Sequence, residues 1–487
     1  MTAATPLTER VSFLKSSQRE HLHLLGIGGT GMTALAGLLQ DSGCRVTGSD
    51  KELYPPTSTI LERLGVEVHT GYDPAHLDPE PDLVVVGNAI SRGNPEVEEM
   101  LDRRLTYVSM PQLIARRFLT GRHSMVVSGT HGKTTTSSIL ARVLAGAGRD
   151  PGFLIGGAPL DFDLPFRVGT GEAFVIEGDE YDTAFFDKGP KFMHYRPDTA
   201  LLGTVEFDHA DIFRDLHEVK TVFRRLINLI PRRGLLVCHE DSPVVREVAR
   251  KAFCRVEGYG LERGRWRAVE MEEAEAGVRF RVVRDERPFV DVSLRVPGAH
   301  NALNALAVVA AAADRGLSPD EIKSGLESFR GVRRRLEPKG EIGGIEVFDD
   351  FAHHPTAISN TLHAVRRRFA GRRVWAVVEP RSWSMRKNVF QQQLAEAFDD
   401  ADRVLIAGVF GSTAIAEGDR LDTDRLVCDL SARGRAAEFV PNVDGILERL
   451  ARSTVAGDVI VVMSNGGFDG LVGRLVEALR ARQTAAS

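Results

Sequence analysis

The fold of this chain is decided by the stretch Ser128-Gly129-Thr130-His131-Gly132-Lys133-Thr134-Thr135-Thr136. The apolar run 125–127 before it predicts a buried strand, and apolar residues at helical spacing after Lys133 predict a helix. Strand, glycine loop, lysine, hydroxyl residue and helix follow one another in the order of a phosphate-binding loop. Glycines let backbone N–H groups turn toward an anion, and the helix N-terminus adds positive potential there.

This loop predicts a nucleotide triphosphate site. Lys133 is expected to neutralise terminal phosphates, and the Thr134 hydroxyl is suited to ligate Mg²⁺. The spacing is short, because two residues separate Gly129 from Gly132, where the common loop has about four. The alternative is a glycine turn before an ordinary helix, but the coincidence of strand, Gly-Lys-Thr and helix favours phosphate binding.

Length and composition limit the number of domains, the kinds of partner and the cellular location to be expected. A chain of 487 residues exceeds what one hydrophobic core supports, so several domains are expected. A net charge of −5 argues against nucleic acid as the main partner, and four widely spaced cysteines form no metal-type pair. Residues 1–21 lack the apolar core of a signal peptide, and no apolar run is long enough to span a bilayer. These features predict a cytoplasmic protein without membrane insertion.

The alternation of strand and helix patterns predicts an α/β protein of three domains. They are a Rossmann-like N-terminal domain in residues 1–120, a central P-loop ATPase domain in 121–330 and a Rossmann-like C-terminal domain in 331–487. In the last domain, strands are expected at 344–348, 374–378, 404–407 and 459–463, with helices such as 357–369 between them.

A second glycine turn lies in the N-terminal domain, where Gly26-Ile27-Gly28-Gly29-Thr30-Gly31 follows a predicted strand and Asp50 ends the next one. Alone, this pattern is typical of dinucleotide binding and allows an NAD-dependent oxidoreductase. The turn requires only that a phosphate lie on a helix N-terminus, so another nucleotide would also fit. Strand 83–86 leads to Asn88, at the edge where open parallel sheets bind ligands. We expect His69 and His76 to lie on the solvated surface.

Acidic residues follow two predicted strands of the central domain. The run Glu177-Gly178-Asp179-Glu180-Tyr181-Asp182 comes after strand 173–176, and Glu206-Phe207-Asp208-His209-Ala210-Asp211 comes after strand 199–202. Carboxylates at a strand end favour Mg²⁺ beside nucleotide phosphates, although an exposed acidic loop is the alternative. His209 among them indicates a metal or phosphate neighbour.

Two further positions have open interpretations. Asn301, at the start of the expected helix 302–313, is suited either to cap that helix or to contact the edge of a base. Arg333-Arg334-Arg335 is either a solvated turn or a charge clamp on a transferring phosphoryl group.

Taken together, the motifs resemble the muramyl ligase family of peptidoglycan assembly over nearly the whole chain. They are Gly-Ile-Gly-Gly-Thr-Gly-Met at 26–32, Gly-Thr-His-Gly-Lys-Thr-Thr-Thr at 129–136, Asp-His at 208–209, His-Asn-x-x-Asn at 300–304 and Asp-Asp-Phe-Ala-His-His-Pro at 349–355. The shortened phosphate loop is a feature of this family. The runs at 87–95, 180–188, 379–382 and 463–468 look most like members that attach a tripeptide to UDP-N-acetylmuramate, rather than L-alanine.

The resemblance implies a three-domain ligase that uses ATP and Mg²⁺ to join a carboxylate to an amine through an acyl phosphate, in the recycling of wall peptides. Its implied partners are UDP-N-acetylmuramate and a muropeptide-derived tripeptide. The implied catalytic residues are Lys133, Glu177, His209 and Arg335. The implied ATP contacts are Gly129, Thr130, His131, Gly132, Lys133, Thr134 and Thr135 at the phosphates, Asn301 at the adenine and Asp350 at the ribose. Arg335 is also implied to contact the ATP phosphates.

The same resemblance implies Thr134 and Glu177 as ligands of one Mg²⁺ and His209 as a ligand of a second. It implies a UDP-substrate site made of Gly28, Gly29, Thr30, Gly31, Asp50 and Asn88, with Arg381 as a further substrate contact. Two segments depart from the family pattern, Gly203-Thr204 and Trp383-Ser384. Lys220 is a candidate for the carbamoylated lysine that some relatives carry. Another class remains open, an ATP-driven switch that binds a partner without ligation.

Overall fold

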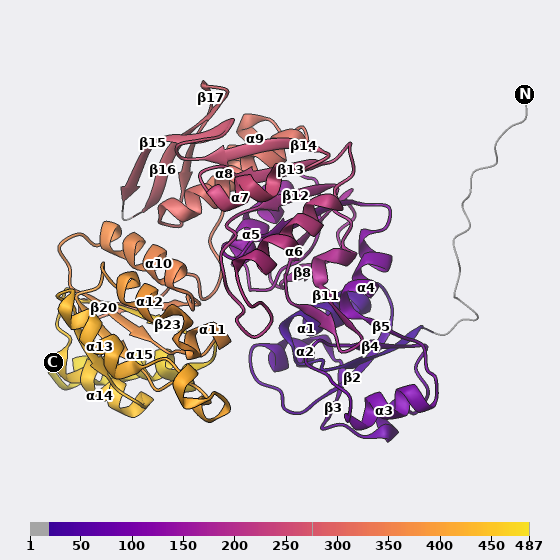
Figure 1. Ribbon diagram of the computed structural model, residues 1–487, viewed down its shortest axis with the longest axis horizontal. Coiled ribbons are helices and arrows are strands. Elements are labelled where there is room, and N and C mark those ends of the chain that lie inside the picture. The colour runs from indigo at the N-terminus through magenta and orange to yellow at the C-terminus, as the bar shows by residue number, and fades with distance from the viewer. Residues whose placement is uncertain (1–18, 275, 487) are drawn as a thin grey trace, which may run out of the picture. The chain divides into compact units, whose positions relative to one another are not determined.

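The computed structural model describes residues 19–274 and 276–486 (Figure 1). Most of the segment in which no signal peptide was expected therefore lies outside the described residues. The chain divides into two compact units, one formed by the residues up to Arg117 with Asp182–Gly189, and the other by Phe118–Tyr181 with Pro190 onward. Within the described residues, every helix is too short or too polar to serve as a membrane span.

The first unit is built on a five-stranded parallel sheet in the order β3-β2-β1-β4-β5. Its strands are β1 (His21–Leu25), β2 (Arg45–Asp50), β3 (Glu67–Thr70), β4 (Leu83–Val86) and β5 (Tyr107–Ser109), and its helices are α1 (Thr30–Asp41), α2 (Thr57–Leu64), α3 (Pro95–Asp102) and α4 (Met110–Ile114). Leu25 pairs with both Ser49 and Val86. The glycine turn, Asp50 and Asn88 thus follow neighbouring strand ends, where such sheets bind ligands.

A hairpin from the middle of the sequence belongs to this first unit. Strands β10 (Asp182–Ala184) and β11 (Asp187–Pro190) pair with each other. Phe185 and Phe186 at their turn pack against the apolar cluster around Leu25 and Val84. The Phe186 ring also meets Tyr107 edge-on, with 5.0 Å between centroids. The contacts of these two aromatic rings stabilise the hairpin in the first unit, although the chain on either side of it belongs to the second unit.

The central sheet has ten strands in the order β17-β16-β15-β14-β13-β12-β6-β9-β7-β8. The strands are β6 (His123–Ser128), β7 (Gly152–Leu154), β8 (Phe166–Arg167), β9 (Ala173–Gly178), β12 (Thr199–Leu202), β13 (Leu235–His239), β14 (Arg255–Gly260), β15 (Trp266–Ala274), β16 (Gly277–Arg284) and β17 (Arg287–Leu294). Strands β6, β7, β9 and β12–β14 run parallel. The antiparallel extension β15–β17, seen clearly in Figure 1, was not predicted from the sequence.

The central part contains the helices α5 (Lys133–Gly146), α6 (Leu216–Asn228), α7 (Pro243–Ala249), α8 (Ala299–Asp314) and α9 (Pro319–Glu327). Of these, α5, α8 and α9 bury apolar side chains in one core. The core joins Ile139 and Leu140 of α5 to the alanine-rich stretch of α8 and to Leu326 of α9. Small alanine side chains let α8 lie close to its neighbours, so α5 is held firmly behind the phosphate loop.

The C-terminal sheet has the order β18-β19-β23-β20-β21-β22 and is parallel except for β18 (Figure 1, orange and yellow). Its strands are β18 (Glu337–Ile342), β19 (Ile345–Asp350), β20 (Val374–Val378), β21 (Arg403–Ile406), β22 (Ala436–Phe439) and β23 (Val459–Met463). The helices are α10 (Pro355–Arg368), α11 (Trp383–Arg386), α12 (Gln391–Ala397), α13 (Thr423–Ala432), α14 (Val443–Ser453) and α15 (Leu471–Ala486).

Both faces of this sheet are covered, as in a doubly wound fold. Val459, Val461 and Met463 belong to the core with α10, α12 and α13, whereas Ile460 and Val462 belong to the core with α14 and α15. Alternate residues of a strand point to opposite faces, so an unbroken apolar strand implies helices on both sides. The predicted α/β class with three domains is confirmed.

Candidate functional site

The phosphate loop lies between β6 and α5, as its sequence predicted. Gly129 has φ +130° and Gly132 has φ +80°, backbone conformations that favour glycine. A Cβ at Gly129 would lie 2.9 Å from the Thr204 carbonyl, and one at Gly132 would lie 2.6 Å from Asn304 Oδ1. Thr130 N–H donates to the same Thr204 carbonyl at 2.7 Å. The departure at Gly203-Thr204 therefore lies directly against the loop and supports it.

Lys133 takes part in a buried chain of charged groups. Its Nζ lies 2.9 Å from Oε2 of Glu180, and Oε1 of Glu180 lies 3.1 Å from Nε2 of His209. Burial opposes charge on all three, but their mutual attraction keeps the pKa of Glu180 low and the pKa values of Lys133 and His209 high. The sequence grouped Glu180 with the acidic run without assigning it a role. Only the structure shows that the Glu180 carboxylate lies between Lys133 and His209.

His209 is held in an uncommon backbone conformation, with φ +56°. Such conformations in residues other than glycine persist where the surroundings enforce them, often at functional sites. The ring of Tyr181 packs edge-on against the imidazole at 4.2 Å. The contacts of His209 with Glu180 and Tyr181 fix the direction of its ring.

Thr134 and Glu177, predicted from the sequence as partners at one Mg²⁺, lie together. Thr134 Oγ1 donates to Glu177 Oε2 at 3.1 Å, and Gly156 N–H donates to Oε1 at 2.6 Å. Burial raises the pKa of Glu177 despite Lys133 and Arg335 nearby, so its ionised form needs more positive charge. A hard divalent cation with oxygen ligands fits this pair, and the donor set suits Mg²⁺.

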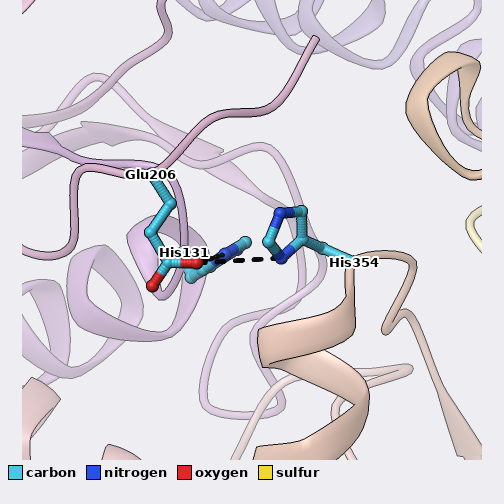
Figure 2. Close-up of side chains that lie close together, drawn as sticks. All are labelled: His131, Glu206 and His354. Atoms are coloured by element: carbon cyan, nitrogen blue, oxygen red, sulfur yellow. Dashed lines mark hydrogen bonds and ion pairs between the residues drawn. The ribbon is translucent and has the colours of Figure 1, made fainter. Parts of the chain in front are cut away.

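A second group of side chains links the loop to the C-terminal sheet. Figure 2 shows His131, Glu206 and His354 turned toward one another, and one ligand atom from each lies within 4.8 Å of the others. His131 Nε2 is 3.3 Å from Glu206 Oε2, which also accepts from the Thr356 hydroxyl at 2.6 Å. His354 caps α10, because its Nδ1 accepts from Thr356 N–H at 3.2 Å. These contacts tie the phosphate loop to the first turn of α10.

Asn301, the residue predicted at the adenine, lies in the first turn of α8. Asn301 is not the cap of α8, since Gly298 is; its Nδ2 donates to the Pro297 carbonyl at 2.7 Å. Its Oδ1 accepts from Asn304, the side chain beside Gly132. One of the two sequence interpretations of Asn301, the helix cap, is therefore wrong.

Arg335 and Asp350 meet at the connection to the C-terminal sheet. The Arg335 guanidinium lies 4.9 Å above the Phe351 ring, and burial lowers its pKa against the opposing pull of Asp350. The Asp350 carboxylate accepts from Leu336 N–H at 2.6 Å and from Ala352 N–H at 2.7 Å. Its oxygens thus hold the connecting segment, a task that the sequence did not indicate, and its contact with a ribose stays a prediction.

In the first unit, the predicted substrate residues surround the glycine turn. Gly28 N–H donates to Asp50 Oδ2 at 2.8 Å, and Tyr72 donates to Asp50 Oδ1 at 3.3 Å. Gly29 is the N-cap of α1, Thr30 begins that helix, and a Cβ at Gly31 would lie 3.1 Å from Met110 Sδ. Asn88 is exposed at the end of β4. The turn therefore has the close packing that its glycines implied.

His69 and His76 are not simply solvated, so that prediction was wrong. Their rings stack at 4.3 Å, and His76 Nδ1 lies 2.7 Å from Oε1 of Glu96. Glu96 is fully buried, and its Oε2 lies 2.6 Å from the Ser49 hydroxyl and 3.1 Å from His23 Nε2. This network braces the end of β2 just before Asp50. No spacing rule in the sequence pointed to Glu96, because its partners come from separate strands and loops.

A cavity of about 290 Å³ opens beside His209 in the second unit. It is lined by Tyr181, Asp208, His209, His353, Arg381, Ser382, Trp383, Ser384, Arg386, Phe410 and Asn465. The departing segment Trp383-Ser384 is part of this wall, where the Ser384 hydroxyl donates to Asp208 at 2.7 Å. Lys220 is not among the lining residues and pairs with Glu247 on α7 at 2.7 Å.

Three family models match the chain in succession. They describe the Mur ligase family catalytic domain at residues 21–119, the Mur ligase middle domain at 127–312 and the Mur ligase glutamate ligase domain at 334–466. The chain belongs to the Mur ligase family, and its enzyme class is therefore that of amide-bond-forming ligases. This membership replaces the oxidoreductase that the first glycine turn alone allowed.

Individual relatives and one solved structure are similar to this chain over nearly its whole length. A UDP-N-acetylmuramate–L-alanyl-γ-D-glutamyl-meso-2,6-diaminoheptandioate ligase of Escherichia coli is 40% identical over 96% of this chain and 99% of its own length. A UDP-N-acetylmuramate–L-alanine ligase of Acidothermus cellulolyticus is 36% identical over 94% of this chain and 95% of its own. The crystal structure of a murein peptide ligase from Psychrobacter arcticus has a TM-score of 0.72 and 38% identity, covering 95% of this chain and 99% of that one.

Proposed function

We propose that this protein is an ATP-dependent ligase that joins the lactyl carboxylate of UDP-N-acetylmuramate to the amino group of L-alanyl-γ-D-glutamyl-meso-diaminopimelate, in peptidoglycan recycling. The observation that carries the proposal is the path Lys133–Glu180–His209, which leads from the phosphate loop to the cavity lined by Arg381. An ATP site and an acceptor site that share one chain of charged groups suit a two-stage ligation. Two relatives that are 39–40% identical to this chain carry the corresponding name.

In the first stage, the muramate carboxylate attacks the terminal phosphorus of ATP, and ADP leaves. The N–H groups of 129–135 and Lys133 bind and orient the phosphates, and Arg335 offsets charge on the group in transfer. Thr134 and Glu177 would hold one Mg²⁺, and His209 would be a ligand of a second ion once its imidazole is neutral. Bound Mg²⁺ supplies charge neutralisation at the phosphates. Asn301 and Asp350 are proposed at the adenosine, and Gly28–Gly31, Asp50 and Asn88 at the UDP moiety.

In the second stage, the neutral amine of the peptide attacks the acyl carbon, and the tetrahedral adduct collapses to amide and phosphate. No protein nucleophile is needed, because the acyl phosphate already contains a good leaving group. The cavity positions the amine and, when closed, excludes water that would hydrolyse the acyl phosphate. Arg381 is proposed as a contact of the incoming peptide.

The second candidate is UDP-N-acetylmuramate–L-alanine ligase, the name of relatives at 31–36% identity. Both candidates share the first stage and differ only in the acceptor. An ATP-driven switch would hydrolyse ATP without dependence on muramate.

The test supplies ATP, Mg²⁺ and UDP-N-acetylmuramate with either the tripeptide or L-alanine and measures phosphate release and the amide product. Tripeptide-dependent release is expected. Release with L-alanine alone would transfer the assignment to the second candidate, and release that ignores muramate would favour the switch. Ligands that raise the melting temperature give an independent readout of binding.

A further inference from the structure

The cavity beside His209 contains a buried cation without a counter-charge. Arg386 is 7% exposed. Among the described residues, no carboxylate pairs with its guanidinium, and its Nη2 donates to the Gly411 carbonyl at 2.6 Å. Its Nε is buried without a hydrogen-bond partner. A buried charge without an opposite charge is costly, so this guanidinium is suited to bind an anion.

The surroundings hold Arg386 in place. Its guanidinium lies 4.4 Å from the centroid of the Trp383 ring. The segment 382–387 is also hydrogen-bonded to the loop that follows β12 of the central sheet. Ser384 donates to Asp208, Ala210 N–H donates to the Ser384 hydroxyl at 3.2 Å, and Lys387 donates to the Ala210 carbonyl at 3.3 Å. Because Asp208 and Ala210 flank His209, these contacts place α11 against the loop that carries this histidine.

The same cavity is lined by two more polar side chains, Arg381 and Asn465. Arg381 lies 3.7 Å from the Phe410 ring and reaches only Glu379, at 3.3 Å. Asn465 Oδ1 is buried without a partner. Trp383 and Phe410 are 39% and 46% exposed, so aromatic faces form part of the rim. Two guanidinium groups, an amide and aromatic rims suit an anionic peptide, since guanidinium binds carboxylate through paired N–H donors.

We propose that Arg386, assisted by Arg381, forms a subsite that binds a carboxylate of the acceptor peptide and so selects acidic peptides as substrates. This inference rests on the proposed ligase function. The carboxylate supplies the counter-charge that the Arg386 guanidinium lacks. It also anchors the peptide, so that its amino group can approach the acyl phosphate. Arg386 is in this view a specificity-determining residue that contacts the acceptor and takes no proton.

The test compares wild type with Arg386→Met, Arg386→Lys and the control Arg433→Met. Arg433 is an exposed arginine of the same domain that pairs with Asp399. Arg386→Met is expected to raise the KM for the tripeptide roughly 10–100-fold, the loss of a charged hydrogen bond. The KM values for ATP and UDP-N-acetylmuramate should stay within twofold, Arg386→Lys should recover part of the loss, and Arg433→Met should behave as wild type.

Acceptors whose carboxylates are amidated one at a time complete the experiment. Amidation of the bound carboxylate should raise the KM strongly in wild type and little further in Arg386→Met, the non-additivity expected of direct partners. Additive effects, an unchanged peptide KM, or a rise in the KM for UDP-N-acetylmuramate alone would each overturn the inference. Failure of the proposed function is distinct, because wild type itself would then show no tripeptide-dependent phosphate release.

Discussion

The ammonium of Lys133 lies 2.9 Å from the carboxylate of Glu180, so the first residue of α5 is joined to the loop after β9. Both side chains are largely buried, and their pairing satisfies two charges that neither could sustain alone. A triphosphate bound in the loop would draw the same ammonium toward its own oxygens. The pair therefore marks the point at which nucleotide binding would rearrange the charges of the site.

Replacement of this lysine tests the loop directly. Lys133→Met should lower turnover by roughly 10²–10³-fold or more, because a charge aimed at the transferring phosphoryl group is lost. Steady-state phosphate release measures the effect, and circular dichroism confirms the fold. The control is Lys323→Met, at an exposed lysine on α9 whose nearest acid is 3.9 Å away. Turnover within threefold of wild type in Lys133→Met would remove the lysine from the mechanism.

Glu206 links the phosphate loop to α10, so Glu206→Gln should loosen the C-terminal sheet from the central one. Burial acts to raise the pKa of Glu206, but the His131 and Thr356 hydrogen bonds and nearby histidines prevail and bring it to about 2. The amide cannot replace this charged acceptor. We expect trypsin to cleave at Arg333–Arg335, the connection between the sheets, several-fold faster. Glu438→Gln, at an exposed pair with Arg449, is the control. Equal cleavage rates in both variants would contradict the link.

The proposed UDP site is tested at Gly28, the glycine of the turn with the least space for a side chain. A Cβ at Gly28 would lie 2.7 Å from Leu53 Cδ2 and 2.9 Å from Asp50 Oδ2. Gly28→Ala should therefore displace Asp50 and raise the KM for UDP-N-acetylmuramate about tenfold, a cost near 1.4 kcal/mol, while the KM for ATP stays unchanged. Gly473→Ala, in open space on α15, serves as control. An unaltered muramate KM would place the UDP moiety elsewhere.

Glu96 predicts a pH dependence in the first unit. Burial acts to raise its pKa, but hydrogen bonds from His23, Ser49 and His76 lower it below the ordinary value of 4.5. A lowered folded-state pKa means that ionised Glu96 stabilises the fold above pH 4.5, and that this contribution is lost as pH falls through the folded-state value. Glu96→Gln should cost about 1–3 kcal/mol at pH 7, with a smaller difference at pH 4.

Hydrogen exchange of peptides that cover residues 21–50 measures this local stability at each pH. Glu99→Gln, on the same helix but more exposed and paired with Arg103, is the matched control. A difference between Glu96→Gln and wild type that stayed constant from pH 7 to pH 4 would show that the carboxylate charge contributes nothing.

The local sequence predicted the structure correctly where a single strand and the turn after it decide the geometry. The strands at 83–86, 199–202, 374–378 and 459–463 were predicted with their observed bounds. The resemblance to the muramyl ligases implied Thr134 and Glu177 as partners, and their side chains are hydrogen-bonded. The sequence did not predict the hairpin Asp182–Gly189, which belongs to the first unit. The prediction for His76 was wrong because its partner Glu96 is 20 residues away on α3.

The amino-acid sequence by itself determined that the chain forms three α/β domains with a phosphate-loop motif between a strand and a helix, because glycine positions and apolar periodicity act over a few residues. Only the tertiary structure decided which charges meet: Glu180 between Lys133 and His209, Glu206 beside His354, and Arg386 without an acid. Such encounters depend on how separate strands and helices pack, and the energy of a buried charge depends on every neighbour that replaces water around it.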